Sequence, residues 1–218
     1  MRFALTLLAL LLFAPTTIHA QDAQDAQDAQ DGRPAFSWDH VPLYAHLGID
    51  DGLSQDQCEF LADHFDIIAF TGGIVRDGIS VEPKMAAAAK AIKQRNPDAK
   101  VLFYWSSDIP KHQWKLSNAD FPKDGYVRPA VKGKKAHGER SFDVTQPQVR
   151  DWWTDVAAKA VNEYSCDGIF VDGATAGTPG GVWSRLFGKE KAATLEEGMF
   201  TMLKEAKKKA LPENLWVN

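Results

Sequence analysis

The sequence has few cysteines, no excess of basic residues and no glycine-rich phosphate loop, and each absence excludes a class of protein. Two cysteines in 218 residues are too few for a disulfide-stapled scaffold or a structural zinc site. Lys and Arg number 25 against 29 Asp and Glu, an acidic balance that does not suit a nucleic-acid-binding surface. The first strand-like segment leads into HLGIDDG (residues 46–52), which is not the G-x-G-x-x-G fingerprint of a dinucleotide-binding sheet.

What is present is a globular composition with many aromatic side chains. Hydrophobic residues make up 44% of the chain and charged residues 25%, which is typical of a folded domain. Seven Trp accompany 12 Phe and 4 Tyr. These rings either fill a large core or form a flat apolar face on which a sugar ring stacks, and composition leaves both interpretations open.

The N-terminus is predicted to be a secretory signal peptide over residues 1–20. Arg2 precedes an apolar run over residues 3–14, which is too short to span a bilayer, and Ala20 is a small residue suited to cleavage. We therefore expect a secreted or periplasmic protein with no membrane span. The QDA repeat that follows has nothing to bury, so residues 21–35 are predicted to be a disordered spacer before one domain over residues 36–218.

The domain alternates strand-like and helix-like segments. Apolar runs predict four strands, over residues 41–49, 66–71, 101–105 and 168–171. A fifth strand is predicted to start at NLWV (residues 214–217). Helices are predicted between them: Ser54 and Gln57 form a capping box, Pro83 and Pro147 suit first helical turns, and residues 195–209 are helical. Apolar strands separated by helices predict a parallel sheet with right-handed crossovers.

The position of the acidic residues favours a barrel over a doubly wound sheet. Asp50, Asp108 and Asp172 each follow a predicted strand directly, at the end where (β/α)8 enzymes place their chemistry. The fold class expected is therefore α/β, of the (β/α)8 TIM-barrel type. A full barrel takes about 250 residues, so we expect a C-terminally truncated barrel covering the first four to five β/α units.

Two segments resemble a known group of enzymes. SFDVTQPQVRDWW (residues 141–153) followed by CDGIFVDGA (residues 166–174) is similar to paired segments of secreted TIM-barrel glycoside hydrolases, in particular the family-15-like group of hypothetical glycosyl hydrolases. YAHLGI (residues 44–49) and NPDAKVLFYW (residues 96–105) are similar as well. The resemblance implies a catalytic carboxylate at Asp172, a poly- or oligosaccharide substrate and no cofactor.

Glycosidic cleavage needs a second carboxyl group beside Asp172, one group donating a proton and the other acting as nucleophile or base. The candidates for this partner are Asp50, Asp51 and Asp108, or an acid beyond Asn218. Each candidate has a structural alternative, because a strand-end Asp also forms turns and caps helices.

Several other residues are candidates for substrate binding. Strand alternation lets only one of Trp105 and Tyr104 face the barrel interior, and the remaining candidates are His46, Trp114, Trp183 and Asp143. Each candidate also has a purely structural interpretation: the rings can be core residues, as any large aromatic side chain can, and Asp143 can accept hydrogen bonds from backbone N–H groups at the start of a helix. The segment over residues 109–142 is basic, with Lys111 among its cations, and forms either a solvated loop or a rim that attracts an acidic polysaccharide.

Two other functions remain open at this point. One is a non-catalytic carbohydrate-binding barrel that keeps the aromatic rim, and the other is a metal-dependent barrel phosphodiesterase, which needs more ligands than the spacing of acids and histidines offers. We expect no metal, no nucleic-acid partner and no protein partner. Cys58 and Cys166 are predicted to be buried thiols far apart in the fold.

Overall fold

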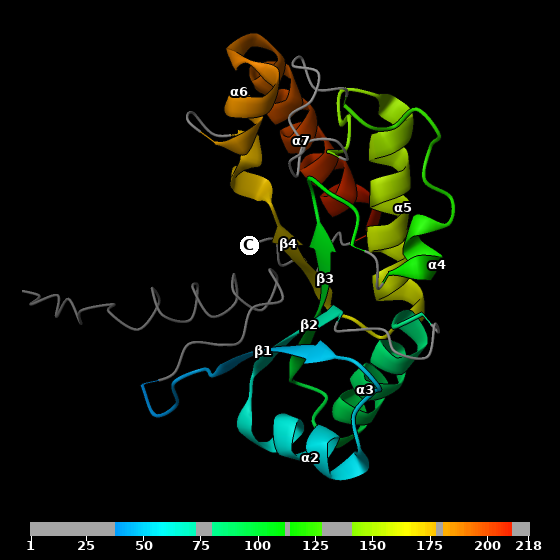
Figure 1. Ribbon diagram of the computed structural model, residues 1–218. Coiled ribbons are helices and arrows are strands. Elements are labelled where there is room, and N and C mark those ends of the chain that lie inside the picture. The colour runs from blue at the N-terminus through cyan, green and yellow to red at the C-terminus, as the bar shows by residue number, and fades with distance from the viewer. Residues whose placement is uncertain (1–37, 73–79, 112–113, 128–140, 178–180, 211–218) are drawn as a thin grey trace, which may run out of the picture.

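A computed structural model describes the central part of the chain, and its elements are arranged as in Figure 1. The described residues are 38–72, 80–111, 114–127, 141–177 and 181–210. The predicted signal peptide, the predicted spacer, residues 112–113 and 128–140 of the basic segment and the predicted fifth strand lie outside them.

The structure has one parallel sheet of four strands in the order β1-β2-β3-β4. The strands are β1 (Tyr44–Ile49), β2 (Ile67–Gly72), β3 (Lys100–Ser106) and β4 (Gly168–Asp172). Each lies within three residues of its predicted bounds, because short apolar runs closed by Gly, Ser or Asp mark buried parallel strands. The register sets Tyr44 opposite Ile67 and Ser106 opposite Asp172.

Helices connect the strands. They are α2 (Gln55–His64), α3 (Glu82–Arg95), α4 (Lys115–Asn118), α5 (Pro147–Glu163), α6 (Val182–Phe187) and α7 (Lys189–Ala210), with a 3-10 turn, η2 (Ala174–Gly177). The predicted capping box of α2 is confirmed, since Gln57 N–H donates to Ser54 Oγ at 3.3 Å and Ser54 N–H to Gln57 Oε1 at 2.9 Å. Helix α7 begins before the predicted Leu195, and α6 was not predicted.

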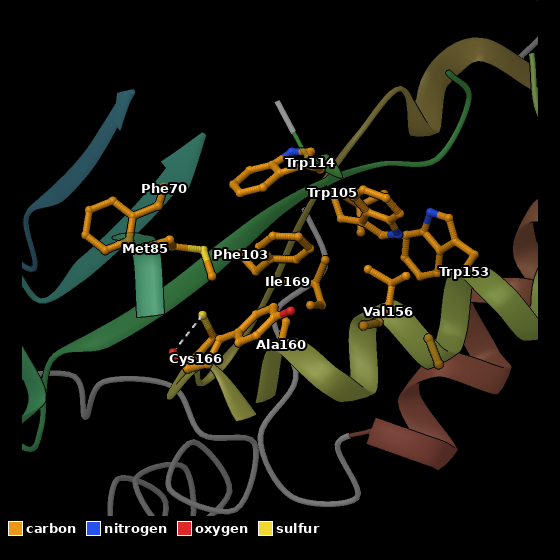
Figure 2. Packing of buried hydrophobic residues seen from close by; sticks show 14 of the residues in the cluster. Phe70, Met85, Phe103, Trp105, Trp114, Trp153, Val156, Ala160, Cys166 and Ile169 are labelled. Carbon is orange, nitrogen blue, oxygen red and sulfur yellow. Dashed lines mark hydrogen bonds between the residues drawn. The ribbon is translucent and has the colours of Figure 1, made fainter. Parts of the chain in front are cut away.

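The two faces of the sheet have different surroundings. Helices α2, α3 and α5 lie on one side of it (Figure 1). Strand residues of one parity are part of the buried core on that side. Phe103, Trp105 and Ile169 lie against Val156 and Ala160 of α5 (Figure 2). The other parity carries a set of rings that we call the aromatic face, made of Tyr44, His46, Tyr104 and Phe170.

The two cysteines are both buried and neither is disulfide-bonded, as predicted. Burial raises the pKa of the Cys58 and Cys166 thiols, which keeps both in the unreactive protonated form. Among the described residues, no helix has an apolar stretch long enough to cross a membrane.

A buried carboxylate joins the segment after β3 to helix α3. Glu82 is fully buried in the first turn of α3, and it accepts hydrogen bonds from Ser117 N–H at 2.8 Å and Ser117 Oγ at 2.9 Å. The Ser80 hydroxyl donates to its other oxygen. Because Ser117 belongs to α4, Glu82 holds this short helix against α3.

Candidate active site

Asp108 and Asp172 lie beside each other at the carboxyl ends of β3 and β4. Ser107 joins the two strand ends, because its N–H and its hydroxyl donate to the carbonyl of Asp172 at 2.8 and 2.9 Å. Gly173 follows with a φ of 81°, in the left-handed region. A Cβ at this glycine would lie 2.5 Å from Asp108 Oδ1, so the absence of a side chain at Gly173 lets the Asp108 carboxyl approach.

The carboxylate of Asp172 is partly exposed and has two side-chain partners. The Tyr104 hydroxyl donates a hydrogen bond to Oδ2, and Lys111 Nζ lies 3.3 Å from the same oxygen. Burial raises the pKa of Asp172, but the Tyr104 hydrogen bond, the Lys111 charge and the Gly173 backbone N–H together outweigh it. The pKa of Asp172 therefore lies below its usual value, and the group is ionised.

The carboxyl of Asp108 is shifted in the opposite direction. Burial is the largest cause and raises the pKa of Asp108; the Ser106 hydroxyl, which donates to Oδ1 at 2.8 Å, and the Lys111 charge lower it only in part. The negative charge of Asp172 raises it further. Two neighbouring carboxyl groups with pKa values pushed apart are the arrangement that separates a proton donor from an ionised carboxylate.

The segment after β3 is anchored so that Lys111 reaches Asp172. The carbonyl of Lys111 accepts from Asn118 Nδ2 at 2.8 Å and from Trp114 N–H at 3.2 Å. Phe142 N–H donates to the carbonyl of Asp108 at 2.8 Å. In the sequence, Lys111 was distinguished only as one of the basic residues of its segment. Its position three residues after Asp108 is the feature that could have pointed to a place in the site.

The aromatic face lies on the same side of the sheet as Asp172. Tyr104 and Phe170 stack with ring centroids 5.9 Å apart, and His46 meets Phe170 edge-on at 4.8 Å. The Tyr44 hydroxyl and His46 Nδ1 are 2.9 Å apart. His46 and Tyr104 thus share one face, and sugar binding by either residue stays a prediction.

The three tryptophans predicted to contact sugar are core residues, so these predictions are wrong. Trp105, Trp114 and Trp183 have exposed fractions of 1%, 0% and 0%, which leaves no ring face for a ligand. Strand alternation turns Trp105 toward the helices, where it packs 5.4 Å from the Trp152 ring, while Trp114 meets Phe103 edge-on at 4.7 Å. Trp183 lies on α6, in a segment that was predicted to be a loop.

Asp143 lies before α5, and Asp50 directly follows β1. Asp143 accepts from Thr145 Oγ1 at 2.5 Å and from Gln146 Nε2 at 3.2 Å, and Lys191 Nζ of α7 lies 3.4 Å away. These contacts order the start of α5, and substrate binding by Asp143 stays a prediction. Asp50 ends β1, and β2 and β3 separate that strand from β4, so Asp108 is the strand-end acid beside Asp172.

The described part of the chain contains no cluster of side chains suited to bind a metal ion. No group of three or more His, Cys, Asp or Glu side chains is placed there to hold an ion.

Comparison with known families agrees with the site. The model of hypothetical glycosyl hydrolase family 15 matches residues 93–218, more than half of the chain. The chain belongs to this family. The matched region contains Asp108, Lys111 and Asp172, whereas His46 and Asp50 lie outside it. No curated protein matches the chain.

Solved structures share the fold at low sequence identity. The glycoside hydrolase domain of PelA from Pseudomonas aeruginosa aligns with a TM-score of 0.57 and 13% identity, over 80% of this chain and 58% of that domain. The galactosidase domain of alpha-galactosidase-sucrose kinase aligns with a TM-score of 0.53 and 14% identity, over 82% of this chain and 26% of that one.

A third similar structure is a GH36 alpha-galactosidase from Geobacillus stearothermophilus in complex with stachyose. It aligns with a TM-score of 0.51 and 10% identity, over 81% of this chain and 27% of that chain. The predicted fold class is confirmed: the parallel β/α units have the TIM-barrel fold of these structures, and the chain spans only part of their length.

Proposed function

We propose that this member of the family hydrolyses a glycosidic bond of a poly- or oligosaccharide, with Asp172 as the ionised carboxylate and Asp108 as the proton donor. The observation that carries the proposal is the pair itself, two adjacent strand-end carboxyl groups whose pKa values are shifted in opposite directions. Family membership and the shared fold support the reaction class.

The two groups divide the chemistry. Protonated Asp108 donates its proton to the glycosidic oxygen as the bond to the anomeric carbon breaks. Ionised Asp172 either attacks the anomeric carbon or takes a proton from the water that attacks it. In the first course, water deprotonated by Asp108 then displaces Asp172 from the anomeric carbon, and the two displacements together retain the anomeric configuration. The second course is a single displacement that inverts it.

Substitution of the two acids tests the roles directly. We expect Asp172→Asn and Asp108→Asn each to lower kcat on a responsive polysaccharide by about 10²- to 10⁴-fold, the usual contribution of a positioned acid or base. Release of reducing sugar measures the rate, and the exposed Asp151→Asn on α5 is the matched control. Full activity in Asp172→Asn would refute the proposal, and full activity in Asp108→Asn would move the donor to another residue.

The pH profile of kcat/KM is a second test. The active form has Asp172 ionised and Asp108 protonated, so activity falls when pH drops below the lowered pKa of Asp172 or rises above the raised pKa of Asp108. We expect a bell with an acidic optimum and limbs on either side of the usual Asp range. Activity that increases steadily through neutral pH would contradict these assignments.

The aromatic face supports a second candidate, a carbohydrate-binding protein without turnover. Tyr44 is 46% exposed and His46 is exposed beside it, so rings near Asp172 are accessible to a ligand. Under this alternative neither the native chain nor Asp172→Asn releases sugar, yet both bind the same polysaccharide in affinity electrophoresis.

The predicted signal peptide supports a separate proposal, that the protein is exported. We expect the mature protein outside the cytoplasm, and N-terminal sequencing of the exported form to begin at Gln21.

A further inference from the structure

One oxygen of Asp172 receives both of the side-chain contacts that the structure gives this carboxylate. Tyr104 donates its hydroxyl hydrogen bond to Oδ2, and Lys111 Nζ lies 3.3 Å from that same atom. The Gly173 backbone N–H adds a hydrogen bond to the same carboxylate. The two side-chain donors come from different places, since Tyr104 lies within β3 and Lys111 lies in the segment that follows it.

We propose that Tyr104 and Lys111 form a clamp on Oδ2 of Asp172, which fixes the orientation of the carboxylate toward the substrate. This inference rests on the proposed function and adds two positioning residues to it. Both residues act through Asp172, because the contacts that carry the proposal are made to its carboxylate.

Tyr104 is well placed for this role because its own ring is held. The ring stacks on Phe170 at 5.9 Å with an interplanar angle of 12°, and His46 meets it edge-on at 5.7 Å. Burial, and then the neighbouring Asp172 carboxylate, raise the pKa of Tyr104, so its hydroxyl stays protonated and donates throughout the neutral range. A donor that cannot turn away keeps Asp172 in one rotamer.

Lys111 supplies charge rather than a fixed direction. Its side chain is 25% exposed, and Nζ lies 5.7 Å from the centre of the Tyr104 ring as well as 3.3 Å from Asp172. The backbone of Lys111 is tied to α4 by the Asn118 amide, which limits how far the ammonium group can move. An ammonium group at this distance favours the ionised form of Asp172.

The clamp has an expected kinetic signature. Loss of a hydrogen bond to an ionised group weakens the orientation and the ionisation of Asp172, so Tyr104→Phe and Lys111→Met should each lower kcat by about 10- to 100-fold. We expect KM to change little, because the substitutions leave the surface of the aromatic face in place. Lys111→Arg keeps the positive charge and should recover most of the rate.

A titration without substrate tests the clamp independently of turnover. Carbon-13 NMR follows the carboxyl carbon of Asp172 in the full chain, and the signal is assigned by its absence in Asp172→Asn. In Tyr104→Phe and in Lys111→Met the midpoint should move to higher pH than in the native protein. Tyr164→Phe, at the end of α5, and the exposed Lys123→Met are matched controls that should leave the midpoint unchanged.

The outcomes separate the clamp from the proposed function. Unchanged Asp172 midpoints in both clamp variants, with native circular dichroism, would overturn the clamp even if the protein hydrolyses sugar. Shifted midpoints with no hydrolysis of any polysaccharide would support the clamp and refute the glycosidase proposal. A rise in KM without a fall in kcat would also overturn the clamp, because that pattern belongs to a residue that binds substrate.

Discussion

Gly173 gives the sharpest test of the site geometry, because only a missing side chain lets Asp108 reach its position beside Asp172. At a φ of 81° an alanine is strained, at a cost of about 1–3 kcal/mol. Its Cβ would also lie 2.5 Å from Asp108 Oδ1 and 2.7 Å from Cγ, both inside contact distance. Overpacking of this kind adds about 1–3 kcal/mol, so Gly173→Ala should destabilise the fold by about 2–6 kcal/mol in total.

Gly188 provides a matched control for the strain alone. Its φ is 83°, close to that of Gly173, and an added Cβ would have no heavy atom within 4 Å. Gly188→Ala should therefore cost only about 1–3 kcal/mol of unfolding free energy in urea denaturation. Removing the whole obstructing side chain in an Asp108→Gly background should bring the cost of Gly173→Ala close to that of the control, because the Asp108 Cβ would also lie 3.2 Å from the added one. Equal costs for both glycines in the native background would refute the close approach of Asp108.

Two further predictions concern buried groups away from the site. Glu82→Ala leaves the Ser80 and Ser117 donors without an acceptor, and each such donor costs about 1–3 kcal/mol. The substitution should therefore lower the unfolding free energy by about 2–4 kcal/mol. Unchanged stability in urea would contradict this. Cys58 and Cys166 should react with a thiol reagent only after denaturation, and a reductant should leave the melting temperature unchanged; absence of free thiols in the unfolded chain would show a disulfide instead.

Most of the fold was predictable because its signals are local. The bounds of β2 and β3 followed from apolar runs, and the start of α2 from the spacing of Ser54 and Gln57. Strand alternation also placed Tyr104 and Trp105 on opposite faces of the sheet, but it left open which of the two faces the barrel interior. Helix α6 was missed because six residues between glycines carry too little periodicity to stand out from a loop.

The assignment of individual rings was less successful, because composition does not say which face of an element a ring occupies. Trp105 and Tyr104 are neighbours in the sequence, yet one is a core residue and the other touches Asp172. Trp114 lies in the segment expected to form a rim, and contacts with Phe103 bury it completely.

By itself the sequence determined the parallel β/α order and the acids that end β3 and β4, since strand pattern and residue type are properties of short segments. Only the tertiary structure decided that Asp108 is the one buried against Gly173, and that Lys111 and Tyr104 meet on one oxygen of Asp172. The physical reason is that burial and charge at a carboxyl group depend on atoms brought together from separate elements, and these surroundings set which acid holds a proton.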